Sequence, residues 1–137
     1  MALLSFHLEP RSGVPYYVQL ADQVRHGVHF GLLRSGDQLP TVREVVAEVA
    51  VNPNTVLRAY RELEYGGLVV MKPGSGTFVA DGAAAAIDQE LYGSLRRELE
   101  HWIDSGRARA VDDETLAALF DHVLHGKQRG ASHERRC

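Results

Sequence analysis

The sequence predicts a mainly α-helical protein with one small β-hairpin, and three observations carry this prediction. Two short segments, beginning at Thr41 and Asn52, each start with a helix-capping residue and continue with apolar residues at helical spacing. Two β-rich segments, 68–72 and 77–80, flank a glycine-rich stretch, which is typical of a hairpin. Beyond residue 83, apolar residues recur every three or four positions and predict two longer helices.

The composition fits one compact domain with a modest extension, because 45% of the 137 residues are hydrophobic. No apolar run approaches the ~18 residues that a membrane-spanning helix needs, and no charged-then-apolar signal segment follows Met1. The single cysteine, Cys137, excludes an internal disulfide and a zinc site built from cysteines. We therefore expect a cytoplasmic protein with no membrane partner.

The net charge of −3 is unevenly distributed along the chain. Residues 1–80 contain seven Lys/Arg and seven Asp/Glu, whereas residues 81–137 contain eight and eleven. The excess negative charge therefore lies entirely in the second part. Binding of DNA by the first part would depend on where its arginines stand, not on net charge. The balanced charge of residues 1–80 is also compatible with a module that binds protein instead of DNA.

The N-terminal residues predict a short extended arm over residues 1–13, followed by a helix. Pro15 suits the first turn of that helix, where its missing N–H would have no partner. An apolar residue at every fourth position from Leu20 to Val28 predicts one buried stripe, and the helix should run to about Gly31.

The next two helices are short and separately capped. Thr41 and Glu44 form a capping box, in which each side chain satisfies a backbone N–H of the other residue. Asn52 caps the following helix, with Pro53 at its first position. Only a tight turn fits between the two helices, so the second should cross the first, as in a helix-turn-helix. Their expected apolar faces are Val42, Val45, Val46 and Val49 in one, and Val56, Ala59, Tyr60 and Leu63 in the other.

Together with the glycine-tipped hairpin, these helices predict a winged helix-turn-helix domain over residues 1–82, an arrangement that places a helix in the DNA major groove. Near the start of the second helix, Asn54 can bond adenine, Arg58 can bond guanine, and the methyl group of Thr55 can pack on thymine. Small residues at the tip of the wing would permit close approach to a minor groove. The candidate DNA-binding residues are Thr41, Arg43, Asn52, Asn54, Thr55, Arg58, Arg61, Lys72, Gly74, Ser75, Gly76 and Thr77.

At these motifs the sequence resembles the GntR family of bacterial transcription regulators. The resemblance runs from Pro15 to Val79 and rests on the segments 36–43, 52–56, 61–64 and 74–79. The Asn-Pro-Asn-Thr-Val signature at 52–56, with a short tail, is similar to the YtrA subfamily. The resemblance implies a homodimer that binds a palindromic operator, usually as a repressor, through two C-terminal helices that dimerise.

The chain departs from the family pattern at three positions. Two arginines that many members carry around the helix cap are replaced here by Pro53 and Leu57, which leaves base reading to Asn54, Thr55 and Arg58. The usual turn glycine before Val51 is Ala50. If that position is left-handed, alanine should cost about 1 kcal/mol.

The C-terminal part predicts a two-helix extension over residues 83–126 and a disordered tail over 127–137. The alanine run 83–86 suggests a helical connection, Gly106 suggests the end of the first helix, and Asp112-Asp113 the start of the second. Two helices alone cannot bury their apolar stripe, so we expect a dimer interface, although folding back onto the first helix is an alternative. The expected interface residues are Leu91, Leu95, Leu99, Trp102, Leu116, Phe120 and Leu124.

The sequence offers no motif for enzyme chemistry or for a cofactor. No nucleophile accompanies a base, and the glycines at 74 and 76 lack the strand-to-helix context of a nucleotide site. Histidine pairs at 26/29 and 122/125 have chelating spacing but no evident third ligand, so we predict no metal site. A fused aminotransferase domain, which some family members carry, does not fit in this length. The size of the extension leaves room for a small-molecule effector only in a crevice at the dimer interface.

Overall fold

The computed structural model describes residues 4–134, with side chains described for residues 4–126. The chain divides into two compact units, Met1–Tyr92 and Gly93–Cys137, which we call the winged-helix unit and the C-terminal unit. The first unit extends past Gly82, where the sequence suggested a boundary, as far as Tyr92. Within residues 4–134, no helix is long and apolar enough to cross a membrane.

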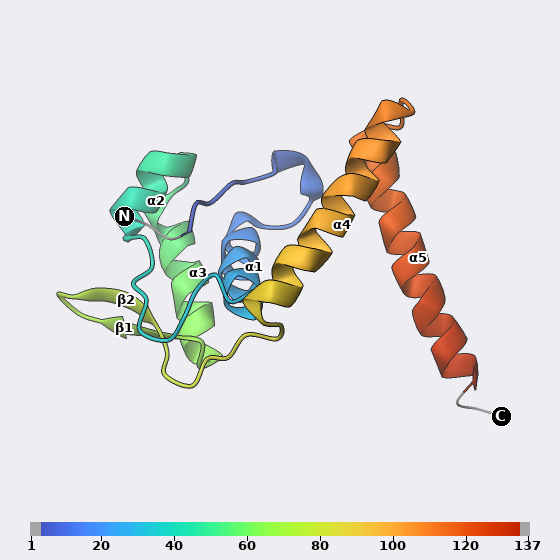
Figure 1. Ribbon diagram of the computed structural model, residues 1–137. Helices are drawn as coiled ribbons and strands as arrows, with labels where there is room; N and C mark the ends of the chain where they lie inside the picture. Colours follow the sequence, from blue (N-terminus) through green and yellow to red (C-terminus); the bar gives the residue numbers. More distant parts are fainter. Residues whose placement is uncertain (1–3, 135–137) are drawn as a thin grey trace. The chain divides into compact units, whose positions relative to one another are not determined.

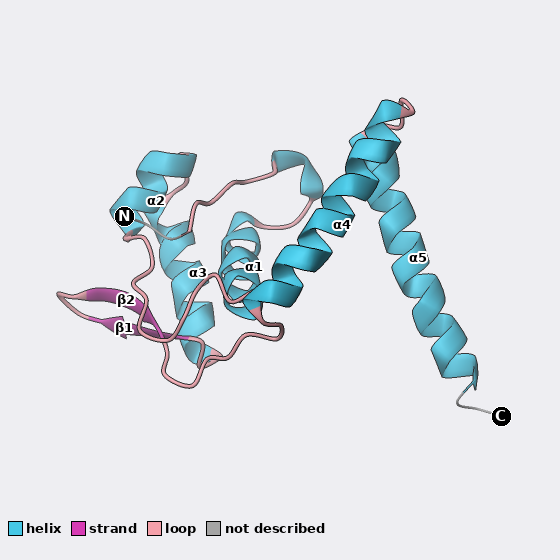
Figure 2. Ribbon diagram, viewed as in Figure 1, coloured by secondary structure: helices cyan, strands magenta, loops and turns pink. Residues whose placement is uncertain are grey.

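In the winged-helix unit, α1, α2 and α3 are followed by an antiparallel hairpin (Figure 1). The element bounds are η1 Pro10–Ser12, α1 Tyr16–His29, α2 Val42–Val49, α3 Pro53–Tyr65, β1 Val69–Lys72 and β2 Gly76–Val79. Val69 pairs with Val79, and Lys72 pairs with Gly76. The hairpin projects beyond the three helices (Figure 2), as the wing of a winged helix-turn-helix does. The predicted fold class is confirmed.

The core of this unit lies mainly between α1 and α3, and the apolar stripes expected for both helices are buried. The two helices bury Leu20, Ala21, Val24 and Val28 from α1, and Val56, Ala59, Tyr60 and Leu63 from α3. From α2 only Val45 is fully buried, while its other three valines are half-buried. Val69 and Val79 attach the hairpin to the same core. The hydrophobic effect of this shared interior holds together helices that are too short to be stable alone.

Tyr60 is the largest of the fully buried side chains, and its hydroxyl has a specific partner. The hydroxyl donates a hydrogen bond of 2.6 Å to the carbonyl oxygen of Pro40, just before α2. Burial, followed by the charges of Glu44 and Glu48, raises the pKa of Tyr60 far above its ordinary value. The hydroxyl therefore stays protonated and links α3 to the entry of α2.

The turn between α2 and α3 is built as the sequence predicts. Glu44 N–H donates to Thr41 Oγ1 at 3.1 Å, and Thr41 N–H donates to Glu44 Oε1 at 3.4 Å, which completes the capping box. Ala50 closes α2 in the left-handed conformation, with φ 52° and ψ 46°. Asn52 then caps α3 by accepting a 2.8 Å hydrogen bond from Asn54 N–H. The turn thus holds a residue type that pays a steric penalty for its conformation.

Residues 4–9 of the N-terminal arm are extended, as expected, and are hydrogen bonded to side chains of α1 and α2; Pro10–Ser12 form η1, and residues 1–3 lie outside the described residues. Gln23 both donates to the carbonyl oxygen of His7 and accepts from its N–H, at 2.7 and 3.1 Å. Gln19 does the same for Glu9, at 3.0 and 2.8 Å. Glu48 of α2 accepts from the N–H of Phe6, whose ring is buried in the core.

The alanine run 83–86 is not helical, which corrects the sequence expectation. Ala86 N–H instead donates to His29 O at 2.9 Å, so the run is held by contacts with the end of α1. The helix α4 Gln89–Ala108 begins only where Asp88 Oδ1 accepts from Leu91 N–H at 2.7 Å. Tertiary hydrogen bonds and a capping aspartate therefore override the high helix propensity of alanine.

The C-terminal unit consists of most of α4 and of α5 Asp113–Glu134. Gly106 does not end the first helix, as expected from the sequence, but lies inside it. A Cβ at Gly106 would overlap the Leu116 side chain, so this glycine lets α4 and α5 approach closely. Residues 127–134, expected to belong to a disordered tail, continue α5; residues 135–137 lie outside the described residues.

The turn between α4 and α5 is held by aspartates, as expected for the start of a helix. Asp112 Oδ1 accepts from Thr115 N–H at 2.8 Å. Hydrogen bonding with the side chain and the backbone of Thr115 lowers the pKa of Asp112. Arg107 forms a two-point ion pair with Asp113 at 2.8 and 2.9 Å, which lowers the pKa of Asp113. Ala110, in the same turn, is left-handed with φ 65°.

Candidate nucleic-acid interface

The outer face of α3 carries most of the candidate base-reading residues. Asn54, Arg58 and Arg61 are exposed, and Thr55 is half-buried. They share the helix with the buried stripe of Val56 and Leu63, which fixes the side that faces outward. Asn54 and Thr55 lie in the first turn of α3, at the positive end of the helix dipole, which favours an approaching phosphate.

Two of the candidate residues, Thr41 and Asn52, are engaged as helix caps. Thr41 Oγ1 accepts from Glu44 N–H, and Asn52 Oδ1 accepts from Asn54 N–H. Both side chains are exposed, so the Asn52 amide N–H₂ and the Thr41 hydroxyl hydrogen can still be donated. Their first role is to fix the starts of α2 and α3. Arg43, one residue into α2, is exposed and has a guanidinium available for phosphate or guanine.

Arg58 has a ring contact that the sequence analysis missed. Its Cζ lies 3.8 Å from the centre of the Tyr17 ring, in the first turn of α1. These residues are far apart in the sequence and no motif joins them, so only the packing of α1 against α3 reveals the pair. Arg61, by contrast, makes no hydrogen bond, ion pair or ring contact within the described part of the chain.

The wing brings Lys72 and the glycine tip next to the start of α2. Thr41 and residues 71–77 line a shallow hollow of about 400 Å³. Lys72 is exposed, with Nζ 5.1 Å from the centre of the Phe78 ring. At the end of α3, Glu64 accepts a 2.8 Å hydrogen bond from Met71 N–H, so the wing is tied to α3. The candidate residues of wing, α2 and α3 therefore belong to one packed unit.

Two wing positions have structural roles that the sequence analysis did not foresee. Thr77 is buried, with 9% of its surface exposed, and lines the hollow beside the start of α2. A Cβ at Gly76 would lie only 2.6 Å from Gln38 Nε2, so this glycine serves the close approach of Gln38. Gly74, with φ 79° and open space around it, and the exposed Ser75 remain at the tip.

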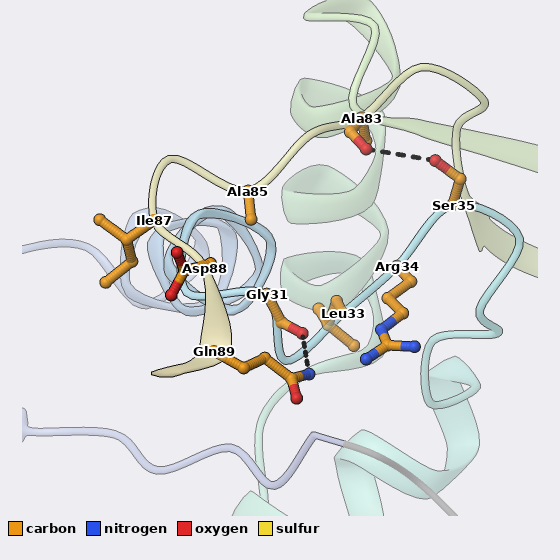
Figure 3. A pocket seen from close by; sticks show the side chains of 9 residues that line it. All are labelled: Gly31, Leu33, Arg34, Ser35, Ala83, Ala85, Ile87, Asp88 and Gln89. Atoms are coloured by element: carbon orange, nitrogen blue, oxygen red, sulfur yellow. Dashed lines mark hydrogen bonds between the residues drawn. The ribbon is translucent and has the colours of Figure 1, made fainter. Parts of the chain in front are cut away.

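A second hollow, of about 380 Å³, lies where the segment before α4 meets the turn after α1 (Figure 3). Ser35 Oγ donates to Ala83 O at 3.2 Å, and Gln89 Nε2 donates to Gly31 O at 3.4 Å, across the hollow. Phe30 stacks on Tyr92, with ring centres 5.2 Å apart. These contacts explain why the winged-helix unit reaches Tyr92. No motif in the sequence predicts this hollow.

The expected dimer-interface residues differ in their exposure. Leu95, Leu99, Phe120 and Leu124 keep between 42% and 48% of their surface exposed, and Leu91 keeps 45%. Trp102 is half-buried. Leu116, with 5% exposed, instead packs inside the C-terminal unit against Gly106. The apolar stripe thus separates into one buried contact and a set of half-exposed side chains. Within the described residues, no three His, Cys, Asp or Glu side chains gather as a metal site would require.

Comparison with known proteins identifies the family. The sequence profile of the bacterial regulatory proteins of the gntR family matches residues 16–79. The HTH-type transcriptional repressor YtrA of Bacillus subtilis (strain 168) is 32% identical over 109 residues, which cover 80% of this chain and 84% of that protein.

Solved structures agree with the sequence match. YtrA from Sulfolobus acidocaldarius, a GntR-family transcription factor, superposes with a TM-score of 0.53 at 28% identity, covering 74% of this chain and 96% of that one. AraR(DBD) in complex with operator ORX1 superposes with a TM-score of 0.50 at 27% identity, covering 58% and 99%. The winged helix-turn-helix, its exposed α3 and these likenesses agree: the chain belongs to the GntR family and is a YtrA-like DNA-binding transcription regulator.

Proposed function

We propose that the protein is a repressor that binds a palindromic operator as a homodimer. One observation carries the dimer: Leu95 and Leu99 of α4, and Phe120 and Leu124 of α5, stay about half exposed in the single chain. Large apolar side chains in such a row are stabilised when another surface covers them. A second copy supplies a matching row, and a two-fold dimer matches the symmetry of a palindromic site. The relative from Bacillus subtilis is named a transcriptional repressor, which supports the direction of regulation.

In this proposal α3 lies in the major groove and reads base edges with Asn54, Thr55 and Arg58. All three stand on the outward side of the helix, in its first two turns. Arg43, Arg61 and Lys72 are exposed cations that neutralise phosphates on either side of the groove. Thr41, Asn52 and the wing tip at Gly74 and Ser75 complete the contacts, while Gly76 and Thr77 support the wing from within.

The dimer is tested by placing a charge on the exposed apolar stripe. Leu99→Glu should give a monomer, because a carboxylate would otherwise be buried without a partner at the interface. His101→Glu is the matched control: it adds the same side chain to α4 at an exposed position two residues away, on another face of the helix. Light scattering should give a monomer for the first variant and a dimer for the second. A dimeric Leu99→Glu variant would place the interface elsewhere.

Salt dependence separates DNA recognition from the alternative of a winged-helix module that binds protein. A dimer that neutralises about six phosphates should lose affinity with a log–log slope near −5 as salt increases. Arg58→Ala should cost roughly 1–3 kcal/mol and relax base preference, whereas Lys72→Ala should weaken all sequences about equally. Gel shifts with the DNA upstream of the protein's own gene supply the measurement. A flat salt dependence would favour the protein-binding alternative.

A further inference from the structure

Tyr17 supports the base-reading arginine from a different helix. It lies in the first turn of α1, half-buried, with its ring packed against the hydrophobic core. Arg58 extends from the exposed face of α3, and its Cζ lies 3.8 Å from the centre of that ring. This distance places the guanidinium in van der Waals contact with the ring, well within the ~6 Å over which cation–π attraction acts. The ring is therefore a fixed support for a side chain that otherwise faces solvent.

The contact matters because the geometry of guanine reading is demanding. A guanidinium bonds guanine O6 and N7 at two points only when its plane is aligned with the base. An unrestrained arginine side chain has many rotamers, and it must lose this rotamer entropy on binding. A ring that already restricts the guanidinium in the unbound protein reduces the entropy lost on binding. It also limits the directions in which the guanidinium N–H groups can point.

Arg61 and Lys72, the other exposed cations of α3 and the wing, lack this support. Arg61, three residues further along α3, has no ring contact, hydrogen bond or ion pair among the described residues. Lys72 lies over the Phe78 ring, but at 5.1 Å, and an ammonium group has no plane to orient. Arg58 is thus distinguished from its neighbours by its orientation as well as by its place on α3.

We propose that Tyr17 is a specificity-determining residue of the DNA interface, which acts as a positioning residue for the guanidinium of Arg58. The inference rests on the proposed role of Arg58 as a base reader. Tyr17 acts through its ring face, so its hydroxyl is dispensable. The base preference assigned to α3 is then shared between α3 and the first turn of α1.

The test compares Tyr17→Leu with Tyr17→Phe, each alone and combined with Arg58→Ala, in the full-length protein. The readout is the relative affinity for every base at each position of a randomised operator library. Tyr17→Phe keeps the ring and should retain the base preference. Tyr17→Leu should reduce discrimination at the position that Arg58 reads by roughly 2- to 30-fold, the range that cation–π energies span. In the Arg58→Ala background, Tyr17→Leu should have no further effect on discrimination.

The outcomes separate this inference from the role of Arg58 itself. If Arg58→Ala leaves base preference unchanged, the proposed reading role fails, and the role of Tyr17 fails with it. If Arg58→Ala relaxes preference but Tyr17→Leu does not, only the positioning role is overturned. An equal effect of Tyr17→Leu with and without Arg58 would mean that the residue merely packs α1, and a Tyr17→Phe variant that behaves like Tyr17→Leu would transfer the role to the hydroxyl. A thermal melt of each variant accompanies the binding data.

Discussion

The two units of the chain are both built from amphipathic helices, but they differ in how far the apolar side chains of these helices are buried. In the winged-helix unit, α1 and α3 bury their apolar stripes against each other, and α2 and the wing complete one interior. In the C-terminal unit, α4 and α5 are longer, yet Leu116 is the only buried residue among their described side chains. The first unit has a shared interior, whereas the second leaves most of its apolar face exposed in the single chain.

The difference shows that the length of a helix does not indicate whether its own chain buries its apolar side chains. The 8 residues of α2 are held by a capping box and by neighbours on two sides. The 20 residues of α4 include good helix formers, yet none of them is buried, although Gly106 lets α5 approach closely. A helix is stabilised when its apolar side chains are buried. The winged-helix unit buries those of its helices within the chain, whereas the C-terminal unit buries only Leu116 among its described side chains.

Removal of the C-terminal unit should give the largest effect. A chain that ends after Tyr92 keeps the whole winged-helix unit and should remain folded, because its interior needs no residue beyond that point. It should become monomeric and lose roughly 10²- to 10⁴-fold in affinity for a full palindrome, the gain that linked binding provides. Circular dichroism, light scattering and gel shifts on full and half sites measure the three outcomes. A truncated chain that stays dimeric would contradict the division of roles.

The second-largest effect should come from replacing one leucine by alanine in each unit and comparing the loss of folding stability. Leu20→Ala opens a cavity in a fully packed interior and should cost about 2–5 kcal/mol of folding stability. Leu95→Ala removes a side chain that is 48% exposed, and should change the stability of its own chain by no more than about 0.5 kcal/mol. Its effect should appear instead as weaker dimerisation, seen as a melting temperature that depends more steeply on protein concentration. Equal losses of folding stability at both positions would remove the contrast.

The left-handed alanines provide a matched pair, one in each unit. Ala50 has φ 52° and Ala110 has φ 65°, so glycine at either position should relieve about 1 kcal/mol of strain. Ala50→Gly should raise the denaturation midpoint of the winged-helix unit, and Ala110→Gly that of the C-terminal unit. Ala47→Gly, at an exposed helical position in α2, is the control and should lower stability by about 0.5–1 kcal/mol.

Acid should produce the smallest of these effects, and we expect it in the turn between α4 and α5. The contacts with Thr115 and Arg107 lower the pKa of Asp112 and Asp113 in the folded chain. Their stabilisation is therefore complete above the unfolded pKa of about 3.9 and is lost as the pH falls through the lower folded values. Both groups are exposed, so solvent weakens the effect. NMR amide shifts of residues 107–116 should follow this titration, and Asp113→Asn should remove the part that Asp113 contributes.

Much of the winged-helix unit follows from local sequence signals, because capping residues mark the starts of α2 and α3 and glycines mark the end of α3. Thr41 with Glu44, Asn52 with Pro53, and the glycines after α3 all act within one helical turn. The same locality explains the errors. Alanine propensity at 83–86 loses to the distant carbonyl of His29, and Gly106 is explained only by Leu116 on another helix. Such partners leave no trace in a short stretch of sequence.

The candidate site shows the same limit. The exposure of Asn54, Arg58 and Arg61 follows from the period of the buried stripe on α3. The burial of Thr77 does not, because a four-residue strand has too few alternations to show which face it buries. The contact between Tyr17 and Arg58 depends on how α1 crosses α3, which no spacing within either helix encodes.

The hydrogen bonds of the N-terminal arm make α1 behave like the edge of a β-sheet. His7 and Glu9 are two residues apart in an extended chain, and Gln23 and Gln19 are four apart on a helix. Two extended residues advance about 6.7 Å, and four helical residues about 6.0 Å, so the two repeats nearly coincide. Each glutamine amide supplies one donor and one acceptor, as a neighbouring strand residue would. The arm therefore has one register on the helix, and an extra residue between positions 7 and 9 would put the two repeats out of step.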